Sequence, residues 1–305
     1  MKALDATSTP KTGAARRERR EIEASSSSRT ARDFRLTGPS HRPDRRINAY
    51  REDLADIRLS ATVLAPHYAR ALVRGCGARS AFIRAAEGEA APAVCELLPG
   101  EDFAVLEYAG GWAWGYRLED SLVGYVEAIA LADRIDPTHV VCETSAPVSP
   151  DDRVTAPLLA SLPMGALLQG EECGACLTTE YGCVSLAHLR RIDDREQDPV
   201  VAAERLLGAP YRAGGRTVAG IDAGGLVQLA LGLCGLAVPR LPDLLAAIGE
   251  PARDQARRGD LVVAGDVIGL MVDDLMMIHA AGEAGKVSVE PVALFPGAER
   301  RRLSL

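Results

Sequence analysis

The 305-residue sequence is poor in aromatic residues, which make up 4% of the chain, and it lacks any long apolar run. A membrane-spanning helix needs about 20 consecutive apolar residues, so none is predicted. The stretch from Met1 to Ser28 also lacks the apolar core of a secretory signal, and we expect a cytoplasmic protein. The formal net charge of -7 argues against a nucleic-acid-binding protein.

The sequence contains 7 cysteines at irregular spacings, an odd number that favours reduced thiols over a disulfide framework. Cys173 and Cys176 form a CxxC pair, and Cys183 and His188 follow them. A structural zinc site needs four ligands, and this spacing is not that of a standard zinc site. Small buried thiols on strands are the favoured interpretation, so we expect neither a metal nor another cofactor.

Composition divides the chain into four parts. Residues 1–46 are rich in Ser, Thr, Arg, Glu and Pro, which predicts a disordered tail. Residues 47–136 contain a short lead-in and then alternating segments broken by Gly and Pro, a pattern typical of a small antiparallel barrel. Within it, FAVLEYAGGWAWGYRL predicts a hairpin with a Gly-Gly turn. Residues 137–192 repeat this order more weakly and predict a second barrel of the same type.

Residues 193–305 change pattern again. DPVVAAERLLG predicts a helix, and a longer apolar helix is predicted to begin after Asp222, which is a suitable N-cap residue. The later stretches RRGDLVVAG, VIGLMVDD, LMMIHAAG and KVSVEPVAL predict strands. Helices followed by an antiparallel sheet indicate an α+β domain.

Two motifs in this last part carry a family resemblance. GAPYRAGGRTVAGIDAGGLVQLAL begins at Gly208, and RRGDLVVAGDVIGLMVDDLMMIHA begins at Arg257. They resemble the two core motifs of the NlpC family of papain-like cell-wall cysteine peptidases, in which bacterial SH3-like domains often precede the catalytic domain. The resemblance therefore implies an α+β, papain-like NlpC domain at residues 193–305, preceded by two small antiparallel SH3-like β-barrels at 47–136 and 137–192.

The resemblance also implies a catalytic Cys, a His and a third polar residue. Ala223 occupies the Cys position and Val267 the His position, whereas His279 retains the third position. The Ser expected after the nucleophile is Gly224, and the Trp of the first motif is Ala213.

Other positions of the first motif match the family. The resemblance points to four substrate-binding positions: Tyr211, Arg216, Asp222 and Gly224. Cys234 lies eleven positions after Ala223, roughly 16 Å along a helix, so we expect it in the core and not in the site.

The family acts on peptidoglycan peptides of the γ-D-glutamyl type. The first hypothesis is an inactive homologue that binds muropeptide fragments, or a partner cell-wall hydrolase, in a regulatory role. The alternatives are an active γ-D-glutamyl endopeptidase that uses unrecognised groups, and a structural scaffold.

Overall fold

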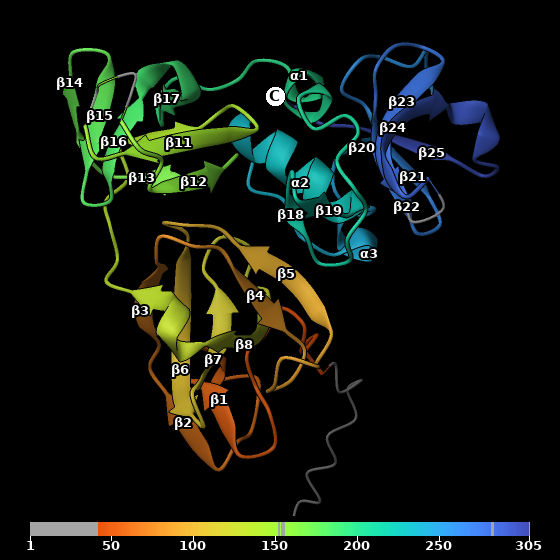
Figure 1. The fold of residues 1–305 in the computed structure, drawn as a ribbon. Helices are drawn as coiled ribbons and strands as arrows, with labels where there is room; N and C mark the ends of the chain where they lie inside the picture. The colour runs from red at the N-terminus through yellow and green to blue at the C-terminus, as the bar shows by residue number, and fades with distance from the viewer. Residues whose placement is uncertain (1–41, 152, 154–155, 282–283, 305) are drawn as a thin grey trace, which may run out of the picture. The chain divides into compact units, whose positions relative to one another are not determined.

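The computed structural model describes residues 42–304, apart from 152, 154–155 and 282–283 (Figure 1). The predicted disordered tail lies outside the described residues up to position 41. The described chain is mostly β-strand, with three short α-helices. The longest of these has 11 residues, and no helix in the described part of the chain could span a membrane.

The first segment contains a parallel strand pair, β1-β2, and a seven-stranded sheet in the order β5-β4-β8-β7-β6-β3-β9. The sheet order is open in the described residues, so a closed barrel remains a prediction. The elements are β1 (Leu54–Asp56), η1 (Ile57–Leu59), β2 (His67–Ala69), β3 (Leu72–Cys76), β4 (Ala81–Arg84), β5 (Ala93–Leu97), β6 (Asp102–Ala109), β7 (Trp112–Arg117), β8 (Val123–Glu127), η2 (Ala128–Ala130) and β9 (Leu131–Ala132).

The predicted Gly-Gly hairpin joins β6 to β7. Ala109 pairs with Trp112, and the two intervening residues, Gly110 and Gly111, have φ values of 57° and 85°. Two consecutive positive φ values are typical of a type I′ turn, which favours glycine and matches the twist of the flanking strands. The structure therefore confirms this hairpin.

The second segment forms a three-stranded sheet, β13-β10-β17, and a five-stranded sheet, β12-β11-β16-β15-β14. Its elements are β10 (His139–Val141), β11 (Ser145–Ser149), β12 (Ala160–Pro163), β13 (Leu167–Leu168), β14 (Glu171–Cys173), β15 (Cys176–Thr179), β16 (Gly182–Ser185), η3 (Leu186–His188) and β17 (Leu189–Arg191).

The third segment contains all three α-helices and a six-stranded antiparallel sheet in the order β20-β25-β21-β22-β23-β24. The predicted helices and the four predicted strands, β21 to β24, are confirmed. The elements are α1 (Pro199–Glu204), β18 (Arg216–Thr217), β19 (Gly220–Ile221), α2 (Ala223–Leu233), α3 (Pro242–Leu245), β20 (Glu250–Pro251), β21 (Leu261–Ala264), β22 (Val267–Met271), β23 (Met276–Ala281), β24 (Lys286–Pro291), η4 (Val292–Leu294) and β25 (Glu299–Arg302).

Helix α2 is the centre of the core of this segment. Ten of its 11 residues are buried, because α1 and the sheet both pack on it. Four residues of the sheet in the same apolar cluster come from alternate positions of β22 and β23, namely Ile268, Leu270, Ile278 and Ala280, and β21 and β24 add Leu261 and Val287. A helix that is apolar on nearly all sides is stable only in such an enclosed position.

Strand β25 was not predicted, and three of its four residues are arginines. The guanidinium of Arg302 donates to both carboxylate oxygens of buried Asp260, at 2.8 Å each, and also to Asp254. Long-range ion pairs therefore neutralise charges that would otherwise disfavour a strand between β20 and β21.

A buried carboxylate joins the first segment to the third. Both oxygens of Glu101 lie 2.8 Å from Nη1 of Arg216, and one lies 3.2 Å from Nη1 of Arg117. Glu101 also accepts from the backbone N–H of Leu98. Two nearly inaccessible guanidinium groups thus share one carboxylate.

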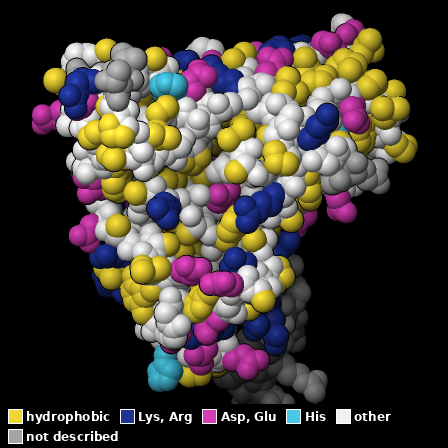
Figure 2. All heavy atoms as spheres, in the orientation of Figure 1, with side chains coloured by type: hydrophobic (Ala, Val, Ile, Leu, Met, Phe, Trp, Pro, Cys, Tyr) yellow, Lys and Arg dark blue, Asp and Glu magenta, His cyan; other side chains and the backbone are white. Residues whose placement is uncertain are grey.

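Charged side chains on the surface do not segregate by sign on the face that Figure 2 shows. Lys and Arg side chains lie among Asp and Glu side chains across that face. Such mixing lacks the single-sign patch that a nucleic-acid-binding face presents.

We predict that Glu101→Gln lowers the free energy of unfolding by about 3 kcal/mol, because it leaves a buried positive charge uncompensated. Urea denaturation measures this change. The matched control is Asp133→Asn, which removes an ion pair with Arg74 at a carboxylate that is 93% exposed. The control should change stability by less than about 1 kcal/mol. An equal effect of the two substitutions would contradict the role of the buried carboxylate.

Candidate functional site

Asp222 fixes the start of α2. Its Oδ1 accepts from the backbone N–H of Gly225 at 2.8 Å, which confirms the predicted N-cap. Its Oδ2 accepts from the backbone N–H of Gly214 at 2.7 Å and from Nη2 of Arg240 at 2.8 Å. These bonds hold the loop before the helix and the chain after it against the first turn, where Ala223 is the first helical residue.

The three positions that the resemblance assigns to a triad line one cavity. Ala223 contributes from α2, Val267 from the start of β22 and His279 from β23. The cavity has a volume of about 680 Å³ and is also lined by Asp266 and Glu290. The fold therefore brings together residues that are 56 positions apart in the sequence (223 to 279).

Strand register places Val267 and His279 on the same face of the sheet. Gly269 pairs with His279, and Val267 is two positions before Gly269, so its side chain points to the same side. A Cβ atom at Gly269 would lie 3.0 Å from the Cβ of His279. The glycine therefore permits the close approach of the two strands beside the imidazole.

His279 is a buried imidazole. Its side chain is inaccessible, its Nε2 lies 3.3 Å from Oε2 of Glu290, and Phe295 packs edge-on at 5.0 Å between ring centroids. Neither ring nitrogen makes a well-formed hydrogen bond within the described residues. Burial lowers the pKa of His279, and the charge of Glu290 opposes this only in part.

Gly224 accommodates a buried arginine. A Cβ atom at this position would lie 2.5 Å from Nη1 of Arg240 and 2.6 Å from its carbonyl oxygen. Because a backbone atom is one of the two contacts, a serine at position 224 would require the chain around Arg240 to move. The change from the family's Ser to Gly is thus coupled to the position of Arg240.

Of the residues predicted to bind substrate, Tyr211 lines the cavity and Arg216 does not. Tyr211 is 39% exposed. Arg216 is buried against Glu96 and Glu101. Their roles in binding stay predictions.

Six residues that line the cavity were not predicted from the sequence: Asp266, in the turn before β22, Ala280 in β23, Ala284, Glu290 near the end of β24, Leu294 in η4, and Phe295 after η4. Asp266 lies within the second motif but has no role assigned there, and Glu290 and Phe295 reach the site through the pairing of β23 with β24 and the ring contact with His279.

Two groups of cysteines lie away from the cavity. Cys234 caps the C-terminal end of α2, and burial raises the pKa of its thiol to about 11. The Sγ atoms of Cys176 and Cys183 lie 3.4 Å apart on neighbouring strands of the second segment. No group of three or more His, Cys, Asp or Glu residues within the described part of the chain is arranged to hold a metal ion.

The comparisons with known proteins match two parts of the chain. Residues 208–295 match the NlpC/P60 family, and residues 83–131 match the bacterial dipeptidyl-peptidase Sh3 domain. The chain contains an NlpC/P60 domain. Its match spans the whole cavity, from Tyr211 to Phe295, and the Sh3 match covers most of the seven-stranded sheet. A search of curated protein sequences found no match.

Two of the following solved structures share the fold. The chain resembles an NlpC/P60 family protein from Bacillus cereus, with a TM-score of 0.65 and 16% identity over 76% of this chain and 99% of that one. It resembles an NlpC/P60 endopeptidase from Photobacterium damselae subsp. piscicida, with a TM-score of 0.51 and 15% identity over 72% and 66%. RipD from Mycobacterium tuberculosis, described as a non-catalytic NlpC/p60 domain protein, has a TM-score of 0.30 and 25% identity over 35% and 95%.

We predict that His279 titrates below its ordinary pKa of 6.5, and that Glu290→Gln lowers the midpoint further by removing the nearby negative charge. Near and below pH 6.5, His279 binds a proton in the unfolded state more readily than in the folded state. The free energy of unfolding therefore decreases as the pH falls through 6.5. NMR titration of the imidazole C–H signals, assigned with His279→Gln, measures the midpoint. A titration midpoint above 6.5 would contradict the lowered pKa of His279.

Proposed function

We propose that the NlpC/P60 domain is a non-catalytic binding domain that holds short peptidoglycan peptides in the cavity beside Ala223. The observation that carries this proposal is the presence of Ala223 and Val267 where a cysteine peptidase of this family needs a thiolate and an imidazole. The methyl group of Ala223 cannot attack a carbonyl carbon, and the isopropyl group of Val267 cannot accept a proton.

An active endopeptidase with a different nucleophile is less well supported. The described residues that line the cavity include no Cys, Ser, Thr or Lys. Cys234 is at the far end of α2, and a thiol with a pKa of about 11 is almost entirely protonated at neutral pH. None of the remaining titratable groups of the cavity is the thiol that a cysteine peptidase requires.

The shape and charge of the cavity support a peptide ligand with a free amine. A volume of about 680 Å³ falls within the usual range for small-molecule sites. Asp266 and Glu290 contribute two carboxylates, and no Lys or Arg is among the described residues that line the cavity. Val267 and Phe295 add apolar surface beside the acidic groups. An ammonium group of alanine or diaminopimelate would pair with the carboxylates.

We also infer that residues 137–192 form a second SH3-like domain, although its sheets do not close. In the segment that matches the Sh3 domain, β8 is followed by the 3-10 helix η2 and then by β9. The second segment repeats this order with β16, the 3-10 helix η3 and β17. The repeat supports the sequence-based correspondence between the two segments.

We predict that Asp266→Asn combined with Glu290→Gln weakens binding of L-Ala-γ-D-Glu-diaminopimelate about tenfold, because two charge-assisted contacts are lost. Calorimetric titration measures the affinity. The control is Glu250→Gln, an exposed carboxylate on β20 outside the cavity, which should leave the affinity unchanged. Equal affinities of the wild type and the double variant would contradict an acidic binding site.

We predict that Ala223→Cys with Val267→His alkylates faster with iodoacetamide near pH 7 than Ala223→Cys alone. The imidazole would stabilise the thiolate, and the first turn of α2 would add a smaller effect. Peptide mapping by mass spectrometry follows the labelling at position 223, separately from the native cysteines. Equal labelling rates would show that positions 223 and 267 do not form a thiolate–imidazole pair in this fold.

A further inference from the structure

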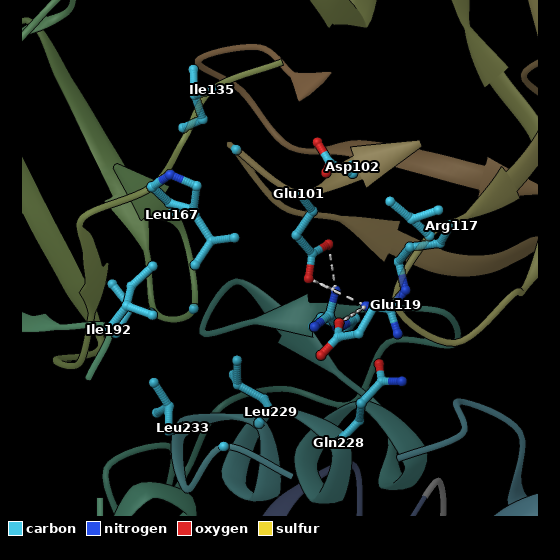
Figure 3. Close-up of a pocket in the computed structure, with 18 of the residues that line it drawn as sticks. Glu101, Asp102, Arg117, Glu119, Ile135, Leu167, Ile192, Gln228, Leu229 and Leu233 are labelled. Carbon is cyan, nitrogen blue, oxygen red and sulfur yellow. Dashed lines mark hydrogen bonds and ion pairs between the residues drawn. The ribbon is translucent and has the colours of Figure 1, made fainter. Parts of the chain in front are cut away.

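A second cavity, of about 410 Å³, lies between the first segment, the second segment and α2. Figure 3 shows its polar end, formed by Glu101, Arg117, Glu119 and Gln228, and its apolar side, where Leu229 and Leu233 rise from α2. None of its lining residues belongs to the cavity beside Ala223.

The polar end contains a buried acceptor without a partner. Nε2 of Gln228 donates to Oδ2 of Asp120 at 3.0 Å and to the carbonyl oxygen of Val238 at 2.9 Å. These two acceptors fix the orientation of the amide, so that Oε1 is the other atom. Gln228 is 3% exposed, and its Oε1 has no hydrogen-bond partner in the described part of the chain. Figure 3 shows this amide pointing away from α2 toward Glu119.

The same end contains a buried donor without a partner. Nη1 of Arg216 is engaged by Glu101 and by the carbonyl oxygen of Glu96, but Nε has no acceptor among the described residues. Arg216 is also 3% exposed. A buried polar atom without a partner costs about 1–3 kcal/mol, so a group that both accepts from Nε and donates to Gln228 would be stabilised here.

The charges at this end disfavour an ionised ligand group. Glu101 pairs with both Arg117 and Arg216, and Arg117 also pairs with Asp120 and Glu119. Three carboxylates therefore surround the two guanidinium groups, so an added carboxylate would be repelled. An added ammonium group has no acceptor role and cannot satisfy Nε of Arg216.

Part of the remaining surface is aliphatic, while Asp102, Arg134, Arg191, Asp194 and Arg195 also line the cavity. Leu167 and Ile192 come from the second segment, and Leu229 and Leu233 come from α2. A branched hydrocarbon fits such a surface through burial of apolar area.

We propose that this cavity is a binding site for a small neutral molecule that carries one amide group on a branched aliphatic body. The amide carbonyl accepts from Nε of Arg216, the amide N–H donates to Oε1 of Gln228, and the hydrocarbon lies against the four aliphatic residues. This site is separate from the proposed peptide cavity and does not depend on it.

The test titrates the full chain with three probes by ligand-observed NMR: isocaproamide, methyl isocaproate and sodium isocaproate. The amide should bind with a Kd about tenfold lower than the ester, which lacks an N–H for Gln228. The carboxylate should bind more weakly than the amide because of the three carboxylates. Equal binding of all three probes, or no binding of the amide, would overturn the proposal.

Gly232 provides a blocking variant that should fold. It lines the cavity from α2, and a Cβ atom there would have no neighbour within 4 Å. A helical side chain leans toward the preceding turn, so Gly232→Phe would extend toward Gln228 and Leu229. Replacing a helical glycine also favours the helix by about 0.5–1 kcal/mol when the new residue is alanine.

Gly232→Phe should abolish binding of isocaproamide, whereas the matched variant Gly232→Ala should retain it. Melting temperatures verify that both variants fold. Binding of L-Ala-γ-D-Glu-diaminopimelate should be the same in both, which separates this site from the peptide cavity. Retention of isocaproamide binding in Gly232→Phe would place the amide elsewhere and overturn the proposal.

Discussion

The carboxylate of Asp222 is the contact on which the peptide cavity depends. It caps α2, binds the loop at Gly214 and pairs with Arg240, so three parts of the chain meet at one side chain. The helix start and this loop are also in direct contact, since a Cβ atom at Gly225 would lie 2.3 Å from the carbonyl oxygen of Gly215. None of these contacts involves the side chain at position 223. The frame that would present a nucleophile therefore persists with alanine in that place.

The elements that local signals specify were predictable from the sequence. Asp222 marked the start of α2, the Gly-Gly pair marked the turn between β6 and β7, and apolar alternation marked β21 to β24. The sequence motifs likewise located Ala223, Val267 and His279, which the fold brings to one cavity.

The rest depends on contacts between distant residues. Strand β25 needs Asp254 and Asp260 to neutralise its arginines. Glu290 reaches His279 only through the pairing of β23 with β24. Arg216 belongs to the first sequence motif, yet its partner, Glu101, is 115 residues away in another segment. No local pattern contains such information.

Helix α2 connects the two cavities. Ala223, its first residue, lines the cavity proposed to bind peptides, and Gln228 on a later turn lines the second cavity, between α2 and the first two segments. The two proposed sites on this helix differ in chemistry: the first is acidic, and the second has a mixed lining of arginines, carboxylates and aliphatic residues. Binding at either site requires no catalytic group.

The proposal of a non-catalytic, peptide-binding domain is tested most directly by an NMR time course. L-Ala-γ-D-Glu-diaminopimelate is mixed with the wild-type protein in this experiment. One sample reports both binding, through broadening or transfer of saturation at the peptide signals, and cleavage, through the appearance of free products. A non-catalytic binding domain should show saturable binding and leave the peptide intact after prolonged incubation. Release of diaminopimelate at a rate proportional to protein concentration, or the absence of any binding, would contradict it.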